Sequence, residues 1–112
     1  LPRAIGPTRA KYLLFTGEFV AASELVEAGL INKVVDDDQL ESATQAVADM
    51  IATKSPLGLR RMKSLIDDGL QQPMDTALRL ELLACEIHAH SADLQEGLAA
   101  FNEKRTPCFT GH

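Results

Sequence analysis

Residues 75–90 constrain the fold more than any other segment, because their apolar positions fall on two sides of a helix. One stripe consists of Leu78, Leu82, Cys85 and Ala89, and the other consists of Leu80, Leu83, Ala84 and Ile87. A helix that is apolar on opposite sides usually packs between two neighbours. In a chain of 112 residues, we expect one of these neighbours to be another subunit. The segment therefore predicts a helical protein that forms oligomers.

Start and stop signals divide the rest of the chain into short helices. Gly, Pro, Ser and Asp recur where helices begin and end, and they predict helices over residues 7–16, 22–28, 38–51, 56–70 and 93–105. Asp38 with Glu41, and Asp93 with Glu96, resemble capping boxes at two of these starts. Residues 31–35 alternate too briefly to anchor a sheet, so they predict an edge strand or an extended link. The expected fold class is mainly α, with at most one short strand.

The composition is that of a soluble globular chain and weakens several function classes. Hydrophobic residues make up 46% and charged residues 24%, which argues against disorder. A net charge of -5 disfavours nucleic acid and anionic membranes as partners. No apolar run approaches the roughly 20 residues of a membrane helix. Two cysteines do not make a disulfide framework and suit a reducing compartment, so we expect a cytoplasmic location.

Phe101 and Lys104 are the candidate binding residues. They lie three positions apart on the last expected helix, which places an aromatic surface beside an ammonium group. An adenine ring can lie against the aromatic face, and the ammonium can neutralise a phosphate. From the residue types alone, a core Phe and a solvated Lys form the simpler interpretation.

Other chemical groups have structural explanations that we favour. Arg60, Arg61 and Lys63 could attract phosphates, but such a cluster is more often an exposed helix face. His88 and His90 are spaced by two, so they point to different helix faces and predict no metal site. Capping and solvated helix faces account for the carboxylates that one would test first for acid/base work, which are Glu81, Glu86, Glu96 and Glu103. We therefore expect no catalytic residue and no metal ligand in this chain.

Four stretches in their order along the chain resemble a known family. They are Thr16-Gly17, Ala21-Ala22, the Gly-Leu-Ile-Asn-Lys-Val-Val run at 29–35, and residues 96–111, which contain Phe-x-x-Lys and a Pro-closed tail. Together they resemble the C-terminal part of the crotonase family, also called the enoyl-CoA hydratase/isomerase family. The resemblance covers the whole chain. It implies that residues 1–35 are a helix-helix-extended segment leaving the α/β spiral core, and that residues 36–112 are a helical capping and oligomerisation region.

The resemblance also implies a function. Family members act on acyl-CoA thioesters, several of them in fatty acid metabolism, with CoA carried by the substrate and no other cofactor. Phe101 and Lys104 match positions that contribute to the CoA site, often on a neighbouring subunit of a trimer. The acid/base Glu residues and the oxyanion-binding N–H groups of the family find no match here. Because the start of the chain resembles the segment after the second of those Glu residues, we expect the active centre upstream of Leu1 and this portion to be inactive alone.

Two other interpretations remain open. The chain could be a non-catalytic, oligomerising helical module without CoA binding, or a separately encoded subunit that completes an active site with an N-terminal partner. A first residue of Leu1, not Met, suggests an excised, trimmed or incompletely ordered piece.

Overall fold

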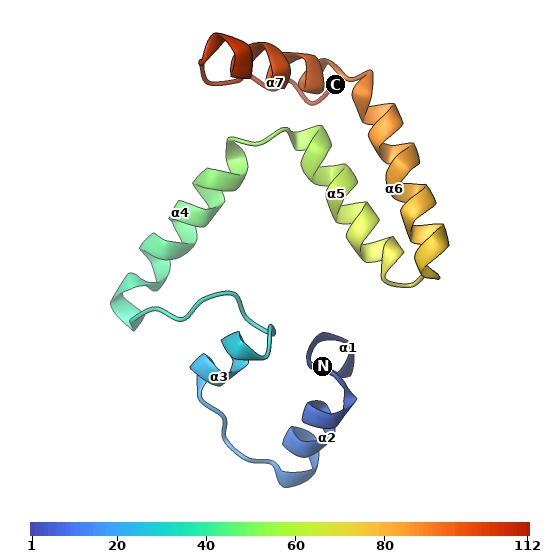
Figure 1. The fold of residues 1–112 in the computed structure, drawn as a ribbon. Helices are drawn as coiled ribbons and strands as arrows, with labels where there is room; N and C mark the ends of the chain where they lie inside the picture. Colours follow the sequence, from blue (N-terminus) through green and yellow to red (C-terminus); the bar gives the residue numbers. More distant parts are fainter. The chain divides into compact units, whose positions relative to one another are not determined.

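The computed structural model describes residues 1–112, which form α-helices and one 3-10 helix but no strand (Figure 1). The elements are α1 Pro2–Ile5, α2 Pro7–Thr16, α3 Ala22–Glu27, η1 Asp37–Gln39, α4 Leu40–Ala52, α5 Pro56–Gly69, α6 Met74–Ala89 and α7 Ala92–Glu103. The expected mainly α fold is therefore confirmed. Residues 33–36 have no regular structure, so positions 33–35 of the expected strand form an extended link.

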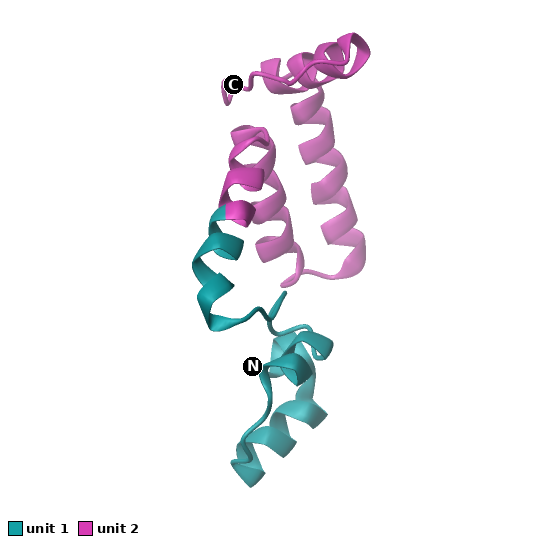
Figure 2. Cartoon of the chain, turned by 90° about the vertical axis from the view of Figure 1, so that its left-hand side faces the viewer, with its two compact units in different colours: residues 1–45 teal, residues 46–112 magenta.

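The chain divides into two compact units, residues 1–45 and 46–112, and α4 begins in the first and ends in the second (Figure 2). In the first unit, α1 packs against α2. The sequence signals predicted α2 and α3 but missed α1, a single turn that starts at Pro2. A hydrogen bond of 3.1 Å from Arg9 Nη2 to the Glu24 carbonyl joins α2 to α3.

Gly17 ends α2 as the sequence predicted. Its φ of 64° lies in the left-handed region, which glycine adopts without the steric cost of a Cβ. Its N–H donates to the Leu13 carbonyl and so satisfies one of the free carbonyls at the helix end. A stop of this kind depends only on neighbouring residues, which is why the sequence alone predicts it.

The second unit is organised around α5 and α6, which lie side by side and run in opposite directions (Figure 1). Ser55 caps α5, since its Oγ accepts a hydrogen bond of 2.9 Å from the Gly58 N–H. Pro56 occupies the first position of this helix, where its missing N–H costs nothing. Beyond α6, α7 packs against the helix before it.

Few apolar side chains are buried within this chain. Ala10 and Ala100 are the buried hydrophobic residues, with exposed fractions of 0% and 1%. The larger residues of both α6 stripes remain largely exposed, namely Leu78, Leu80, Leu82, Leu83 and Ile87. The periodicity identified these positions correctly as apolar helix faces, but the chain does not cover them itself.

Two expected capping boxes are wrong. The Asp38–Glu41 box is replaced by η1, in which Asp38 is a helical residue and Asp36 is the residue before the first turn. At the start of α7, Ser91 is the cap, and its Oγ accepts a hydrogen bond of 3.2 Å from the Leu94 N–H. The sequence pattern placed both caps two residues too late. At α7, the Asp93 carboxylate binds Ser55 and the tail and does not cap its own helix.

Candidate functional site

The start of α7 contains a buried carboxylate that binds two other parts of the chain. Asp93 is 1% exposed. Its Oδ2 accepts a hydrogen bond of 2.5 Å from Ser55 Oγ, and its Oδ1 accepts bonds of 2.9 Å from the N–H groups of Thr110 and Gly111. The Asp93 N–H in turn donates to the His112 carbonyl at 3.1 Å. Asp93 therefore ties the C-terminal tail, residues 106–112, to α7 and to the cap of α5.

The hydrogen bonds to Asp93 also set its charge state. The bond from Ser55, with those from the tail N–H groups, lowers the pKa of the Asp93 carboxyl despite its burial. Because donors favour the ionised form, Asp93 is a carboxylate at neutral pH. A buried carboxylate that accepts this many hydrogen bonds has a structural role. Both oxygens of Asp93 are already engaged, so we do not assign it a general acid or base role.

One turn further along α7, Glu96 and Arg105 form a bidentate ion pair, which we call the Glu96–Arg105 clamp. Arg105 Nη1 lies 2.5 Å from Glu96 Oε1, and Nη2 lies 2.8 Å from Oε2. Arg105 Nε also donates to Glu103 Oε2 at 2.6 Å. Glu96 Oε1 accepts a further bond of 2.7 Å from the Cys108 N–H. Arg105 and the Cys108 N–H lower the pKa of Glu96 to about 2, because they stabilise its carboxylate.

The clamp lies beside the turn that ends α7. The Arg105 N–H bonds to the Ala100 carbonyl at 3.0 Å, and the Lys104 N–H bonds to the Phe101 carbonyl at 3.3 Å. These two bonds make a Schellman turn, which requires a left-handed residue after the helix. Lys104 takes that position with a φ of 56°, the one positive φ among the non-glycine residues of the chain.

The two predicted site residues therefore meet at one helix end, but not as two positions of one helix. The expected helix over 93–105 ends at Glu103, so Lys104 lies just beyond it. Phe101 lies on the last turn with its side chain 83% exposed, and Lys104 is exposed as well. The simpler interpretation of a core Phe does not hold within this chain, whereas the solvated Lys does.

Two of the other candidate cations have polar partners within this chain, Arg61 on the neighbouring helix α6 and Lys63 within α5 itself. Arg61 Nη1 lies 3.0 Å from His88 Nδ1, and Lys63 Nζ lies 2.8 Å from Asp67 Oδ2. The expected role of Glu96 as a capping residue is wrong, since both its oxygens bind groups at 105 and 108. Sequence reasoning missed this contact because no local pattern links residues nine or more positions apart.

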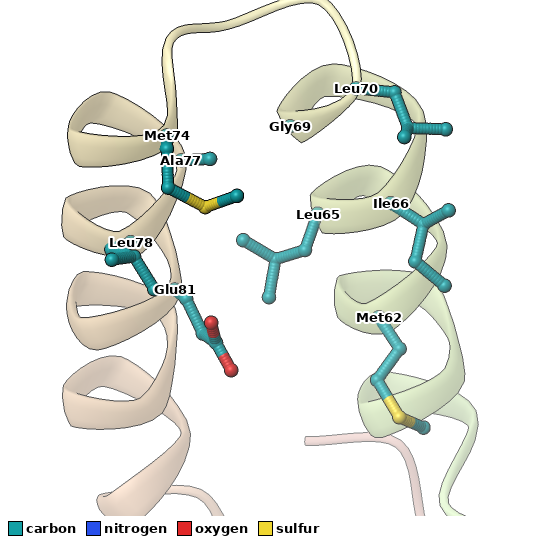
Figure 3. Close-up of a pocket in the computed structure, with 9 residues that line it drawn as sticks. All are labelled: Met62, Leu65, Ile66, Gly69, Leu70, Met74, Ala77, Leu78 and Glu81. Carbon is teal, nitrogen blue, oxygen red and sulfur yellow. The ribbon is translucent and has the colours of Figure 1, made fainter.

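Figure 3 shows an apolar groove between α5 and α6, with Glu81 as its one charged residue. Its volume is about 450 Å³. It is lined by Met62, Leu65, Ile66, Gly69, Leu70, Met74, Ala77, Leu78 and Glu81. Leu65 points into the space between the two helices (Figure 3). No group of three or more His, Cys, Asp or Glu side chains is gathered as for a metal ion. None of the helices combines the length and apolar character required to cross a bilayer.

Comparison with known proteins places the chain in a family. A family model described as "Enoyl-CoA hydratase/isomerase" matches residues 1–112. The chain therefore belongs to the enoyl-CoA hydratase/isomerase family. The expected helical region of the crotonase fold is confirmed by solved structures of that fold, such as an enoyl-CoA hydratase from Bacillus anthracis, with a TM-score of 0.94 and 41% identity. That likeness covers 99% of this chain and 43% of the solved one.

Curated relatives show the same partial coverage. The chain is 37% identical over 109 residues to a crotonyl-CoA hydratase from Syntrophomonas wolfei, covering 97% of this chain and 42% of the relative. It is 39% identical over 111 residues to a 1,2-epoxyphenylacetyl-CoA isomerase from Escherichia coli, covering 99% of this chain and 42% of the relative. This chain thus spans less than half the length of these relatives.

Proposed function

We propose that this chain is the C-terminal helical part of an enoyl-CoA hydratase/isomerase-type enzyme that acts on acyl-CoA thioesters. In this role it supplies contacts to the CoA end of the substrate and contacts between subunits, in a trimer-based assembly in the cytoplasm, and it is inactive alone. Residues 1–35 leave the core of the enzyme, and residues 36–112 cap the site. CoA arrives as part of the substrate, and no other cofactor is needed. Membership of the family and partial coverage of its members support this proposal.

The observation that carries the CoA contact is the conformation of Lys104. A side chain in the left-handed region costs about 1–2 kcal/mol, and glycine is the usual residue at this turn position. The chain nevertheless has an exposed Lys here, at the same helix end as the exposed Phe101. A cation at a position that favours glycine supports a role for its charge, and a phosphate of CoA is a fitting partner.

The partners of three carboxylates support the proposal that this chain is inactive alone. Glu96 and Glu103 both bind Arg105, and Asp93 is a buried tie between segments. We assign the catalytic groups to the part of the enzyme that the family members have in addition to this region.

The CoA contact is tested by measuring CoA affinity in the intact polypeptide that contains residues 1–112. Lys104→Ala weakens binding about tenfold, because a charge-assisted contact contributes about 1.5 kcal/mol. Phe101→Ala also weakens it, while the oligomer size stays unchanged. Lys63→Ala serves as the matched control, since it removes an exposed ammonium that already binds Asp67. Unchanged affinity in both site variants would contradict the CoA contact.

The second test concerns activity. We expect the purified 112-residue chain to turn over crotonyl-CoA no faster than a buffer control. Turnover well above that control would contradict the assignment of the catalytic groups to other polypeptide.

A non-catalytic oligomerising module is the second candidate, and the exposed apolar faces of α5 and α6 favour it. This function predicts that Phe101→Ala and Lys104→Ala leave both CoA affinity and oligomer size unchanged. Polar substitutions in the groove, such as Leu70→Gln, would then reduce oligomer size.

A further inference from the structure

The Glu96–Arg105 clamp holds the residue next to Lys104 at two points. The Arg105 side chain is fixed by both oxygens of Glu96, and the Arg105 N–H is fixed by the Ala100 carbonyl. Ala100 itself is buried, at 1% exposure, so the turn is bonded to a buried part of α7. Lys104 lies between this anchored residue and the end of the helix. Its backbone therefore has little freedom to leave the left-handed conformation.

Glu96 also anchors the chain beyond the clamp. Its Oε1 accepts the Cys108 N–H, so one carboxylate holds residues 105 and 108 against α7. A bidentate contact between a carboxylate and a guanidinium restricts direction as well as distance. Residues 104 and 105 are thereby held between two fixed points, one on the helix and one on the tail.

We propose that Glu96 is a positioning residue that orients the Lys104 ammonium toward a phosphate of CoA through the Glu96–Arg105 clamp. This inference rests on the proposed CoA contact of Lys104. Glu96 does not touch the substrate in this scheme. Its effect on CoA binding passes through Arg105 to the turn that holds Lys104.

Glu103 is the matched control for this role. It also accepts a hydrogen bond from Arg105, but through Nε alone, and its side chain is 61% exposed against 24% for Glu96. It makes no contact with the tail that would fix residue 108. Removing its charge therefore leaves the bidentate contact in place.

The test is a double-mutant cycle for CoA affinity in the intact polypeptide that contains this chain. Glu96→Gln keeps the side-chain shape and weakens CoA binding about fivefold when Lys104 is present. In the Lys104→Ala background the same substitution has no further effect, because there is no ammonium left to orient. Glu103→Gln changes affinity less than twofold in either background.

A second measurement keeps the test independent of stability. Amide hydrogen exchange at Lys104 and Arg105 is faster in Glu96→Gln than in Glu103→Gln. If Glu96→Gln lowers the helix content, the Arg105→Lys variant is measured in its place, since an ammonium cannot make the bidentate contact.

The outcomes separate the two proposals. Equal loss of affinity from Glu96→Gln with and without Lys104, or no loss in either background, overturns the positioning role and leaves the CoA contact standing. Unchanged affinity in Lys104→Ala overturns the proposed contact of Lys104 with CoA, and it contradicts the positioning role as well.

Discussion

Lys104 illustrates how a single residue can take an unfavourable backbone conformation. Its φ of 56° is stabilised by the two hydrogen bonds of the Schellman turn, which satisfy the Ala100 and Phe101 carbonyls at the end of α7. The sequence marked the residue as a candidate through its spacing from Phe101. The left-handed conformation was not predicted, because no glycine marks the turn.

At this scale we predict the effect of two substitutions that both remove the charge. Lys104→Gly is more stable than Lys104→Ala by about 1 kcal/mol, because only glycine adopts the left-handed region without a Cβ clash. Thermal unfolding followed by circular dichroism measures the difference. Equal stability of the two variants would show that the turn is not left-handed in solution.

At the scale of elements, α7 and the tail are joined by both charge and packing. The Phe109 ring lies over Gly97, where a Cβ would be 3.6 Å from Phe109 Cε1, an ordinary van der Waals distance. At the other end of the tail, Gly111 has a φ of 81°, and a Cβ there would lie 3.2 Å from Pro56 Cγ. The two glycines therefore have different reasons to be present.

We predict that Gly97→Ala stabilises the protein by about 0.5–1 kcal/mol, because alanine favours the helix and the space for its methyl group exists. Gly111→Ala destabilises it, because the position combines a left-handed backbone with a close neighbour. Denaturant unfolding of the two variants measures both changes. A destabilising Gly97→Ala would mean that Phe109 packs more closely on α7 than the structure shows.

The attachment of the tail also depends on pH. The pKa of Glu96 is lowered from 4.5 to about 2, so the unfolded state binds this proton more readily than the folded state. Stability from the clamp is therefore fully present above pH 4.5 and is lost as the pH falls toward 2. The lowered pKa of Asp93 acts in the same direction.

We expect NMR amide protection at Cys108 to persist at pH 4.5 and to disappear as the pH approaches 2. In Glu96→Gln, protection at Cys108 is already reduced at neutral pH, while the bonds of Thr110 and Gly111 to Asp93 remain. Loss of protection near pH 4.5 in the unsubstituted chain would contradict the clamp.

At the scale of the whole molecule, the exposed apolar residues are the dominant feature. Apolar residues recur every three to four positions on α4, α5 and α6, yet the large side chains on these helices are not buried by this chain. Exposed apolar surface of this extent is typical of an interaction surface, which is consistent with the subunit contacts that we propose.

We predict that the purified 112-residue chain binds the dye ANS with several times the fluorescence of a compact globular control. Replacing Leu70 and Leu78 in the groove by Gln lowers this signal, whereas Lys63→Gln, outside the groove, leaves it unchanged. A signal no higher than that of the control protein would mean that the chain buries these faces by itself.

The sequence by itself determined the helical class, the stop at Gly17 and the start at Ser55-Pro56, because each depends on residues within one turn of the chain. It also indicated the family through four short stretches. The roles of Asp93 and Glu96 were decided only by the tertiary structure. Asp93 is hydrogen-bonded to Ser55, which is 38 positions away in the sequence, and Glu96 is hydrogen-bonded to Cys108, which is 12 positions away. Contacts between residues so far apart depend on how the helices and tail pack, which no local spacing specifies.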